Sequence, residues 1–115
     1  MAHSKQECNR RLLPVRDTLE VVGGKWKILI LIALMHSDAR RFKELQKHVE
    51  GITARMLSKE LKDLEVHELV TRTVYDSTPV TVEYEATPYA RTLLPVLDEM
   101  YKWGSQHRKR IMKTA

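Results

Sequence analysis

The spacing of apolar residues in the middle of the chain predicts a short helix followed by a tight turn. Phe42, Leu45 and Val49 recur at helical intervals and place this helix over residues 42–49. Gly51 follows, and glycine is the residue that most readily adopts the positive φ found where a helix ends. The pattern therefore predicts a chain reversal at Gly51.

A second helix is predicted over residues 53–67, and its two faces differ in chemistry. Thr53 suits the N-cap position. At about 100° per residue, Leu57, Leu61 and Leu64 form one apolar stripe. A helix held by such a stripe, with cations on the other side, suits the major groove of DNA, although an ordinary solvent-exposed face has the same composition. The side chains opposite the stripe are Arg55, Ser58, Lys59 and Lys62.

Alternating residues after this helix predict a β-hairpin. Segments 69–75 and 80–86 are rich in Val, Thr and Tyr, and the polar cluster 76–79 separates them. A third short strand is expected to begin at Arg41. Helix, turn, helix and a two-stranded ribbon is the order of a winged helix-turn-helix. The predicted fold class is thus mainly α with a small antiparallel β-hairpin.

Two further helices are predicted near the N-terminus. Pro14 suits the first turn of a helix over residues 15–22, which Gly23-Gly24 ends. Residues 25–36 form a helix that is apolar nearly all round and therefore belongs in the core. Residues 1–12 are polar and are expected to form a flexible arm.

The C-terminal region predicts a helix that projects beyond the core. Thr87-Pro88 combines an N-cap with a proline at the first helical position, and Pro95 interrupts the helix that begins there. The domain is expected to span residues 13–107, with a basic tail at 108–115. The stripe after Pro95 can pack on the N-terminal helix or on a second subunit, and a dimer interface is favoured. The residues expected there are Val15, Leu19, Leu97, Met100, Tyr101, Gly104, His107 and Ile111.

Length and charge fit one soluble domain with a polyanionic partner. The chain has 115 residues, of which 30% are charged, and a formal net charge of +5. That charge favours a nucleic acid only modestly. The longest apolar run, Ile28 to Met35, is far shorter than the roughly 20 residues that span a bilayer. With no apolar signal region at the N-terminus, a cytoplasmic location and no membrane partner are expected.

No catalytic or metal-binding pattern emerges from the sequence. The five histidines are scattered, and a single cysteine excludes a four-ligand Cys/His cluster. Glu83 and Glu85 share one face of the predicted hairpin and are interpreted as surface residues or partners of arginines. We therefore expect no enzyme, no metal and no other cofactor.

Several short segments together resemble the HxlR-type winged helix-turn-helix transcriptional regulators, a group related to MarR-type regulators. The resemblance covers roughly residues 13–107. It implies a homodimer that is joined through its terminal helices and binds a two-fold-related operator. The recognition helix would be residues 53–67 and the wing residues 70–85. The matching segments are Gly23-Gly24-Lys25-Trp26, Arg41-Phe42-Lys43-Glu44-Leu45, Gly51 to Leu57, Leu61 to Leu64, Val82-Glu83-Tyr84, Ala86-Thr87 and Trp103-Gly104.

The expected DNA contacts lie on the recognition helix, on the wing and beside the supporting helix. Arg55 is expected to bind guanine through two hydrogen bonds, and Lys62 and Arg72 are expected to meet phosphates. Arg41 has a competing structural role, an ion pair with Glu83. The expected contacts are Arg40, Arg41, Lys43, Thr53, Arg55, Ser58, Lys59, Lys62, Arg72, Thr78 and Thr81.

Two other functions stay open at this point. Many members of the family carry a cysteine directly before the proline of the first helix, but here Leu13 precedes Pro14 and the only thiol is Cys8. Cationic residues close to Cys8 in the sequence favour a thiolate, so thiol sensing is one alternative to a free surface cysteine. The other is a winged-helix protein-interaction module without DNA binding. A small-molecule effector pocket between the terminal helices and the winged core is a further option, but no residue in the sequence argues for it, so the effector is unknown.

Overall fold

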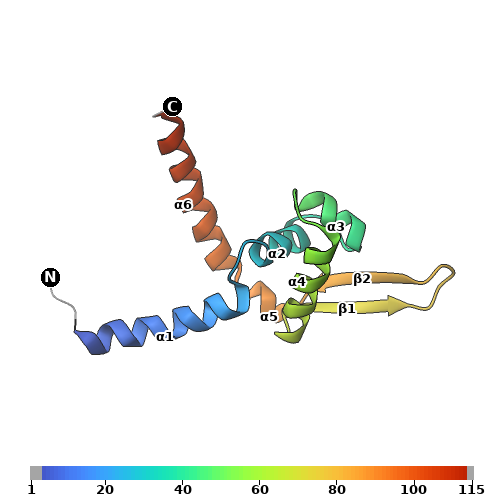
Figure 1. The fold of residues 1–115 in the computed structure, drawn as a ribbon, viewed down its shortest axis with the longest axis horizontal. Coiled ribbons are helices and arrows are strands. Elements are labelled where there is room, and N and C mark those ends of the chain that lie inside the picture. Colours follow the sequence, from blue (N-terminus) through green and yellow to red (C-terminus); the bar gives the residue numbers. More distant parts are fainter. Residues whose placement is uncertain (1–3, 114–115) are drawn as a thin grey trace.

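The computed structural model describes residues 4–113 and places α1 and α6 outside the core (Figure 1). The two helices leave the core in diverging directions, and the hairpin projects from the other side of the molecule. This arrangement confirms the mainly helical fold with a small antiparallel hairpin. Within the described residues, the elements in chain order are α1 (Lys5–Val22), α2 (Lys27–His36), α3 (Phe42–His48), α4 (Ala54–Val66), β1 (Val70–Tyr75), β2 (Thr81–Ala86), α5 (Pro88–Arg91) and α6 (Leu94–Lys113).

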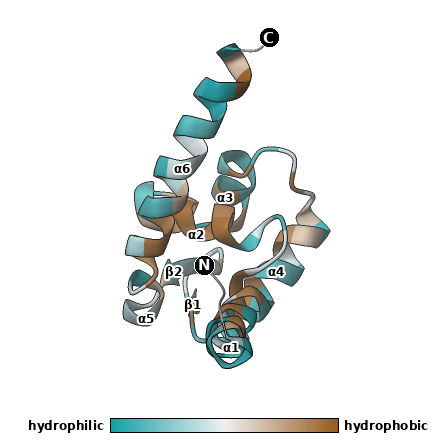
Figure 2. Ribbon diagram, turned by 90° about the vertical axis from the view of Figure 1, so that its left-hand side faces the viewer, coloured by the Kyte–Doolittle hydropathy of each residue, from teal (hydrophilic) through white to brown (hydrophobic). Residues whose placement is uncertain are grey.

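One apolar core joins α2, α3, α4 and the root of the hairpin. Ile30 and Leu45 are fully excluded from solvent. The predicted apolar stripe of α4 is also buried, with no side chain more than 1% exposed; its residues are Leu57, Leu61 and Leu64. Burying one leucine side chain contributes about 1.5–3 kcal/mol, so this stripe fixes which side of α4 faces the core. Figure 2 shows the apolar ribbon segments gathered where α2 meets α3.

The turn that leads into α4 has the geometry that the sequence predicted. Gly51 has φ +90°, and the Thr53 hydroxyl accepts a hydrogen bond from the Met56 N–H at 3.2 Å. The buried indole of Trp26 lies against Gly51, and the Lys25 ammonium sits 4.7 Å from the centroid of that ring. The start of α4 is therefore held from both the turn and α2.

The hairpin contains two antiparallel strands in which Tyr75 pairs with Thr81 and Arg72 with Tyr84. The prediction of a third strand at Arg41 is wrong, because the sheet within the described residues has two strands. The Tyr84 N–H donates to the carbonyl oxygen of Arg40 at 2.7 Å, but the next N–H, that of Arg41, is taken by a carboxylate of α3. One backbone bond thus forms where a strand would need several.

The N-terminal helix begins earlier than predicted. It starts at Lys5 because the Ser4 hydroxyl accepts from the Glu7 N–H at 3.0 Å, which caps the first turn. Pro14 lies inside the helix, where its nitrogen has no proton to donate to the preceding turn. The arm expected over residues 1–12 is therefore helical from residue 5 onward, and residues 1–3 lie outside the described part.

The C-terminal helix restarts near Pro95, as predicted, and continues to Lys113. The residues expected to form a basic tail are thus helical as far as position 113, and the last two lie outside the described part. Leu97 is only 4% exposed within its own chain, because it follows the start of α6 by one turn and still faces the core. Its assignment to an intersubunit surface is therefore wrong.

The two outer helices give the chain an extended shape. The radius of gyration is 17.3 Å, whereas a compact domain of this length has about 13 Å. The accessible surface is 9286 Å², against about 6,500 Å² for a folded monomer of this mass. No helix among residues 4–113 has both the length and the apolar character needed to cross a bilayer.

Candidate nucleic-acid interface

The outward side of α4, which we call the cationic face, consists of Arg55, Ser58, Lys59 and Lys62. All four side chains are exposed. None makes a hydrogen bond or ion pair with any other part of the chain that the structure describes. Because the leucine stripe is buried on the other side, three cations and a hydroxyl are presented to solvent with their hydrogen-bonding groups available.

A groove separates α4 from the hairpin. Its volume is about 320 Å³, and Ser58 and Lys62 line one wall while Arg72 and Tyr84 line the other. Glu65 adds one carboxylate to the α4 wall. The strand register brings Arg72 to this groove, because residues 70, 72 and 74 share one face of β1. The sequence analysis missed Tyr84, which only the register opposite Arg72 reveals.

The arginine that contacts the hairpin is Arg40, not Arg41. Its guanidinium is 3.1 Å from a carboxylate oxygen of Glu85. The predicted pair of Arg41 with Glu83 is therefore wrong, because the backbone bond to β2 is made by residue 40 and brings that side chain next to Glu85. An exposed pair of this kind contributes no more than about 1 kcal/mol, so Arg40 can exchange Glu85 for a phosphate at little cost.

The first turn of α3 is fixed by Glu44. Its carboxylate accepts hydrogen bonds from the N–H groups of Arg41 at 2.9 Å and Arg40 at 3.1 Å. These two bonds hold the pKa of Glu44 below its ordinary value, because they favour the charged form. The bond from the Arg41 N–H has the larger effect. The side chains of Arg40, Arg41 and Lys43 are exposed around this turn.

A charge cluster joins α2 to the flank of α4. The Lys27 ammonium lies 2.7 Å from Glu60 and 3.5 Å from Asp63. Burial lowers the pKa of Lys27, but the hydrogen bond and charge of Glu60, together with Asp63, outweigh it and raise the pKa above its ordinary value. Lys27 therefore neutralises carboxylates that lie on the same helix as the cationic face. The sequence analysis did not foresee this contact.

Three other expected contacts are placed less favourably. The Thr53 hydroxyl already serves as the N-cap of α4. Thr78 and Thr81 lie at the end of the hairpin that points away from α4 (Figure 1), and the Thr81 hydroxyl is 3.5 Å from that of Ser77. The structure thus brings Ser58 and Lys62 of α4 together with Arg72 around the groove and leaves the hairpin tip apart.

The residues expected at a subunit interface lie mostly on exposed faces of α1 and α6. Val15 is 55% exposed, Leu19 62% and Tyr101 76%. The ring of His107 stacks on Trp103 with 5.0 Å between centroids. Met100 and Ile111 are also exposed, and Gly104 is half-buried.

Cys8 is exposed on α1. Among residues 4–113, no three His, Cys, Asp or Glu side chains are grouped so that they can hold a metal ion.

Comparison with known proteins places these features in one family. The family model for HxlR-like helix-turn-helix proteins matches residues 21–112. The chain is similar to the uncharacterised HTH-type transcriptional regulator YtcD of Bacillus subtilis, with 41% identity over 99 residues that cover 86% of this chain and 78% of YtcD. It is 43% identical over 95 residues to the uncharacterised HTH-type transcriptional regulator BH0655 of Halalkalibacterium halodurans, which covers 83% of this chain and 84% of that protein.

Solved structures agree with the sequence comparison. A crystal structure of YtcD superimposes with a TM-score of 0.78 at 42% identity and covers 83% of this chain and 96% of that one. The reduced form of the redox regulator HypR also gives a TM-score of 0.78, at 37% identity, and covers 89% of this chain and 99% of HypR.

Proposed function

This chain belongs to the HxlR-like helix-turn-helix family of transcriptional regulators, and we propose that it acts as a homodimer on a two-fold-related DNA operator. The observation that carries the proposal is the cationic face of α4. Its side chains have no partners among the described residues, and the helix that bears them is anchored by three buried leucines. A rigid helix that offers unpaired cations matches the requirements of the major groove.

In the proposed complex, the first turns of α4 enter the major groove. Arg55 and Lys59 reach base edges, and an arginine held by two hydrogen bonds discriminates guanine by about 1–3 kcal/mol. Lys62 and Arg72 bind phosphates from opposite walls of the groove between α4 and the hairpin. Arg40, Arg41 and Lys43 add phosphate contacts beside α3. Two-fold symmetry then places half-sites roughly 34 Å apart.

The exposed apolar side chains of α1 and α6 support the homodimer. The chain exposes about 2,800 Å² more surface than a compact monomer of its mass, whereas a standard interface buries about 800 Å² per partner. Tyr and Trp are enriched at such interfaces, and two of these large side chains stand on α6. The exposed apolar residues on the two helices are Leu12, Leu13, Val15, Leu19, Val96, Met100, Tyr101, Trp103, Ile111 and Met112.

An electrophoretic shift assay tests the proposed function. The full chain is titrated against duplex DNA from upstream of its own coding region, first at low salt, with a scrambled duplex as the control. We expect a retarded complex that forms at lower protein concentration on the upstream duplex than on the scrambled one. Absence of any complex at low salt would instead favour a protein-interaction module.

A redox switch through Cys8 is a second candidate. The thiol is exposed on α1, and at about 100° per residue it falls on the same side of that helix as Val15 and Leu19. HypR, named a redox regulator, has a closely similar structure. Diamide treatment is expected to change operator affinity in the wild type and to have no effect on Cys8→Ser. Equal affinity of treated and untreated wild type would remove this candidate.

A further inference from the structure

The end of α6 carries the whole net positive charge of the chain. Residues 102–115 contain five lysines and arginines and no aspartate or glutamate, whereas residues 1–101 contain 15 residues of each sign. The formal net charge of +5 therefore belongs to one helix end. The five cations, all of them exposed, are Lys102, Arg108, Lys109, Arg110 and Lys113.

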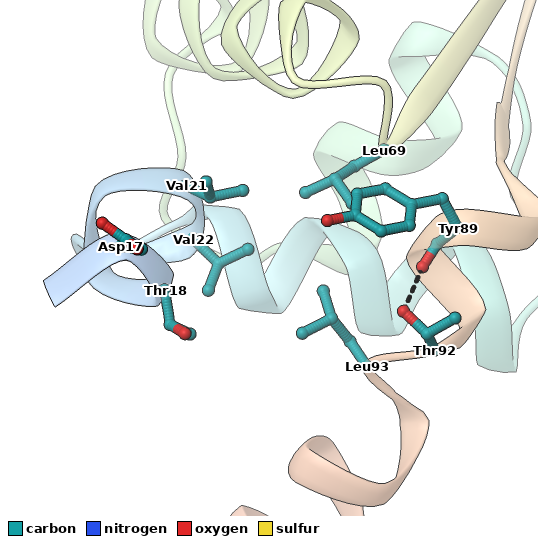
Figure 3. Close-up of a pocket in the computed structure, with 8 residues that line it drawn as sticks. All are labelled: Asp17, Thr18, Val21, Val22, Leu69, Tyr89, Thr92 and Leu93. Atoms are coloured by element: carbon teal, nitrogen blue, oxygen red, sulfur yellow. Dashed lines mark hydrogen bonds between the residues drawn. The ribbon is translucent and has the colours of Figure 1, made fainter. Parts of the chain in front are cut away.

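This helix end stands apart from the winged core, although its root is fixed. Leu93, directly before α6, packs against the core and lines a small cavity together with Val22 of α1 (Figure 3). From there the 20 residues of α6 extend about 30 Å. The far end lies away from α4 and from the hairpin in both views of the ribbon (Figure 1 and Figure 2). The cations at this end are therefore separate from the cationic face.

Three of these cations, Lys102, Lys109 and Lys113, form a row along one side of α6, which we call the lysine stripe. At about 100° per residue, the three positions fall within about 40° of one another. Met100 and Ile111, which belong to the proposed subunit interface, lie on the opposite side of the helix. The lysine stripe therefore stays exposed when α6 packs against a second copy of the chain.

The cations of this helix end have few partners among the described residues. Lys102 lies 3.3 Å from a carboxylate oxygen of Glu99, and the other four make no ion pair there. The pair of Lys102 is weak, because both side chains are mostly exposed and water screens their charges. Like charges close together on one helix repel each other, so a partner with a row of negative charges would relieve this repulsion.

We propose that the lysine stripe binds the phosphates of duplex DNA without regard to sequence, at a place separate from the cationic face of α4. From Lys102 to Lys113 the helix axis rises about 17 Å, which runs past about five phosphates of one DNA strand. A lysine ammonium is a point charge without a planar donor pair, so it meets phosphates rather than selecting a base. A membrane surface fits less well, because the side chains beside the stripe, Ser105 and Gln106, have no apolar group to enter lipid.

The inference goes beyond operator binding, because it needs neither base recognition nor the cationic face of α4. In an operator complex, the α6 ends would hold a second stretch of duplex. Since this contact is indifferent to sequence, its test uses a scrambled duplex. The outcome therefore does not depend on the existence of an operator.

The test is a fluorescence anisotropy titration of the full chain with a labelled scrambled duplex over a salt series. The variant K102Q/K109Q/K113Q removes three charges and replaces them with residues that also favour a helix. Each lysine that neutralises a phosphate adds about 0.9 to the slope of log K against log salt. We therefore expect the slope to fall by about 0.9 for each lysine of the stripe that contacts DNA.

A matched variant controls for the loss of net charge. R10Q/R11Q/R16Q removes three charges from α1, the other outer helix, and is expected to keep the slope of the wild type. An unchanged slope in K102Q/K109Q/K113Q, or an equal fall in both variants, would overturn the proposal. An unchanged slope together with lost binding to vesicles of equal parts phosphatidylglycerol and phosphatidylcholine would assign the stripe to a membrane instead.

A third variant tests whether the two DNA sites are separate. R55A/K59A/K62A removes the cations of the α4 face and is expected to retain salt-dependent binding of the scrambled duplex, which should disappear when the lysine-stripe substitutions are added. Loss of all binding at low salt in R55A/K59A/K62A alone would overturn a separate site on α6. Full wild-type binding in that variant would instead argue against the proposed operator contacts and leave the lysine stripe in place.

Discussion

The ammonium of Lys27 on α2 lies 2.7 Å from a carboxylate oxygen of Glu60 on α4, and both side chains are only 13% exposed. This pair connects the central core helix to the helix that carries the cationic face. Because Glu60 is mostly shielded from water, loss of its partner would leave a carboxylate without compensation. The contact thereby couples the stability of the core to the position of α4.

Replacing Lys27 should destabilise the fold. We expect Lys27→Met to lower the free energy of unfolding by about 2 kcal/mol, somewhat less than the roughly 3–5 kcal/mol found for fully buried pairs, because some water still reaches this one. Urea denaturation at a fixed protein concentration measures the change. Lys47→Met, which removes an exposed ammonium on α3 that makes no ion pair with the described residues, is the control. The double variant Lys27→Met/Glu60→Leu should recover most of the loss, and failure to do so would contradict an electrostatic origin.

The same pair predicts a loss of stability in alkali. The pKa of Lys27 is raised above its ordinary value of 10.5, so the folded state binds this proton more tightly than the unfolded state. The resulting stabilisation is complete below pH 10.5 and disappears as pH rises through the higher, folded-state pKa. Urea midpoints between about pH 8 and 12 should therefore fall more steeply in the wild type than in Lys27→Met. Parallel curves would argue against the raised pKa.

Glu44 predicts the opposite dependence in acid. Its pKa is lowered by the backbone N–H groups of Arg41 and Arg40, so its contribution is present above the ordinary value of 4.5 and is lost as pH falls through the lower, folded-state pKa. Thermal midpoints between about pH 2 and 6 should decline less in Glu44→Gln than in the wild type. Glu50→Gln, an exposed control near the end of α3, should follow the wild type.

Two substitutions on the cationic face should have distinguishable effects on DNA binding. Arg55→Ala is expected to relax base preference at one symmetric pair of positions, with a loss of about 1–3 kcal/mol on the preferred sequence. Lys62→Ala should weaken binding to all sequences alike and reduce the slope of log K against log salt by about 0.9 for each phosphate that is no longer neutralised. Fluorescence anisotropy over a salt series measures both. An equal loss on every sequence for Arg55→Ala would exclude its proposed role in base recognition.

A charge placed on the exposed face of α1 should separate the subunits. Leu19→Asp is expected to convert the proposed dimer to a monomer, because a carboxylate there would have to be desolvated when two copies associate. Sedimentation velocity over a range of concentrations reports the change. Val66→Asp is a matched control, since Val66 is 72% exposed on α4 and is not part of the proposed interface. A monomeric wild type, or a dimeric Leu19→Asp, would contradict the interface.

The elements around α4 could be predicted from the sequence because local signals agreed there. A glycine in the turn, a threonine cap and leucines at helical spacing all pointed to one structure, and the orientation of Arg55 followed from the buried stripe. The start of α1 was harder to predict, because Pro14 suits the first turn of a helix and suggested that the helix begins there. The residues before Pro14 are mostly polar, so no regular spacing of apolar residues indicates a helix in that segment.

The contacts between elements could not be obtained in the same way. The hairpin loop separates strands that end at Tyr75 and begin at Thr81, and a loop shorter by one residue would have moved Arg72 and Tyr84 to different partners. The pair of Lys27 with Glu60 joins residues 33 positions apart, and its charges resemble those of any exposed helix in the sequence. Such relationships depend on the packing of α2 against α4.

At the Gly23-Gly24 junction, a small change of backbone angle would displace the far end of α1 by a large distance. A side chain at position 23 would collide with the Leu19 carbonyl, and position 24 has φ +91°, so this corner is built for glycine. The 18 residues of α1 extend about 27 Å from it. A swing of roughly 10° there would carry the far tip by about 5 Å, more than the step of about 3.4 Å between neighbouring base pairs. In a dimer joined through α1, a slight bend at these two glycines would move the two copies of α4 out of register with the major grooves that they are proposed to enter.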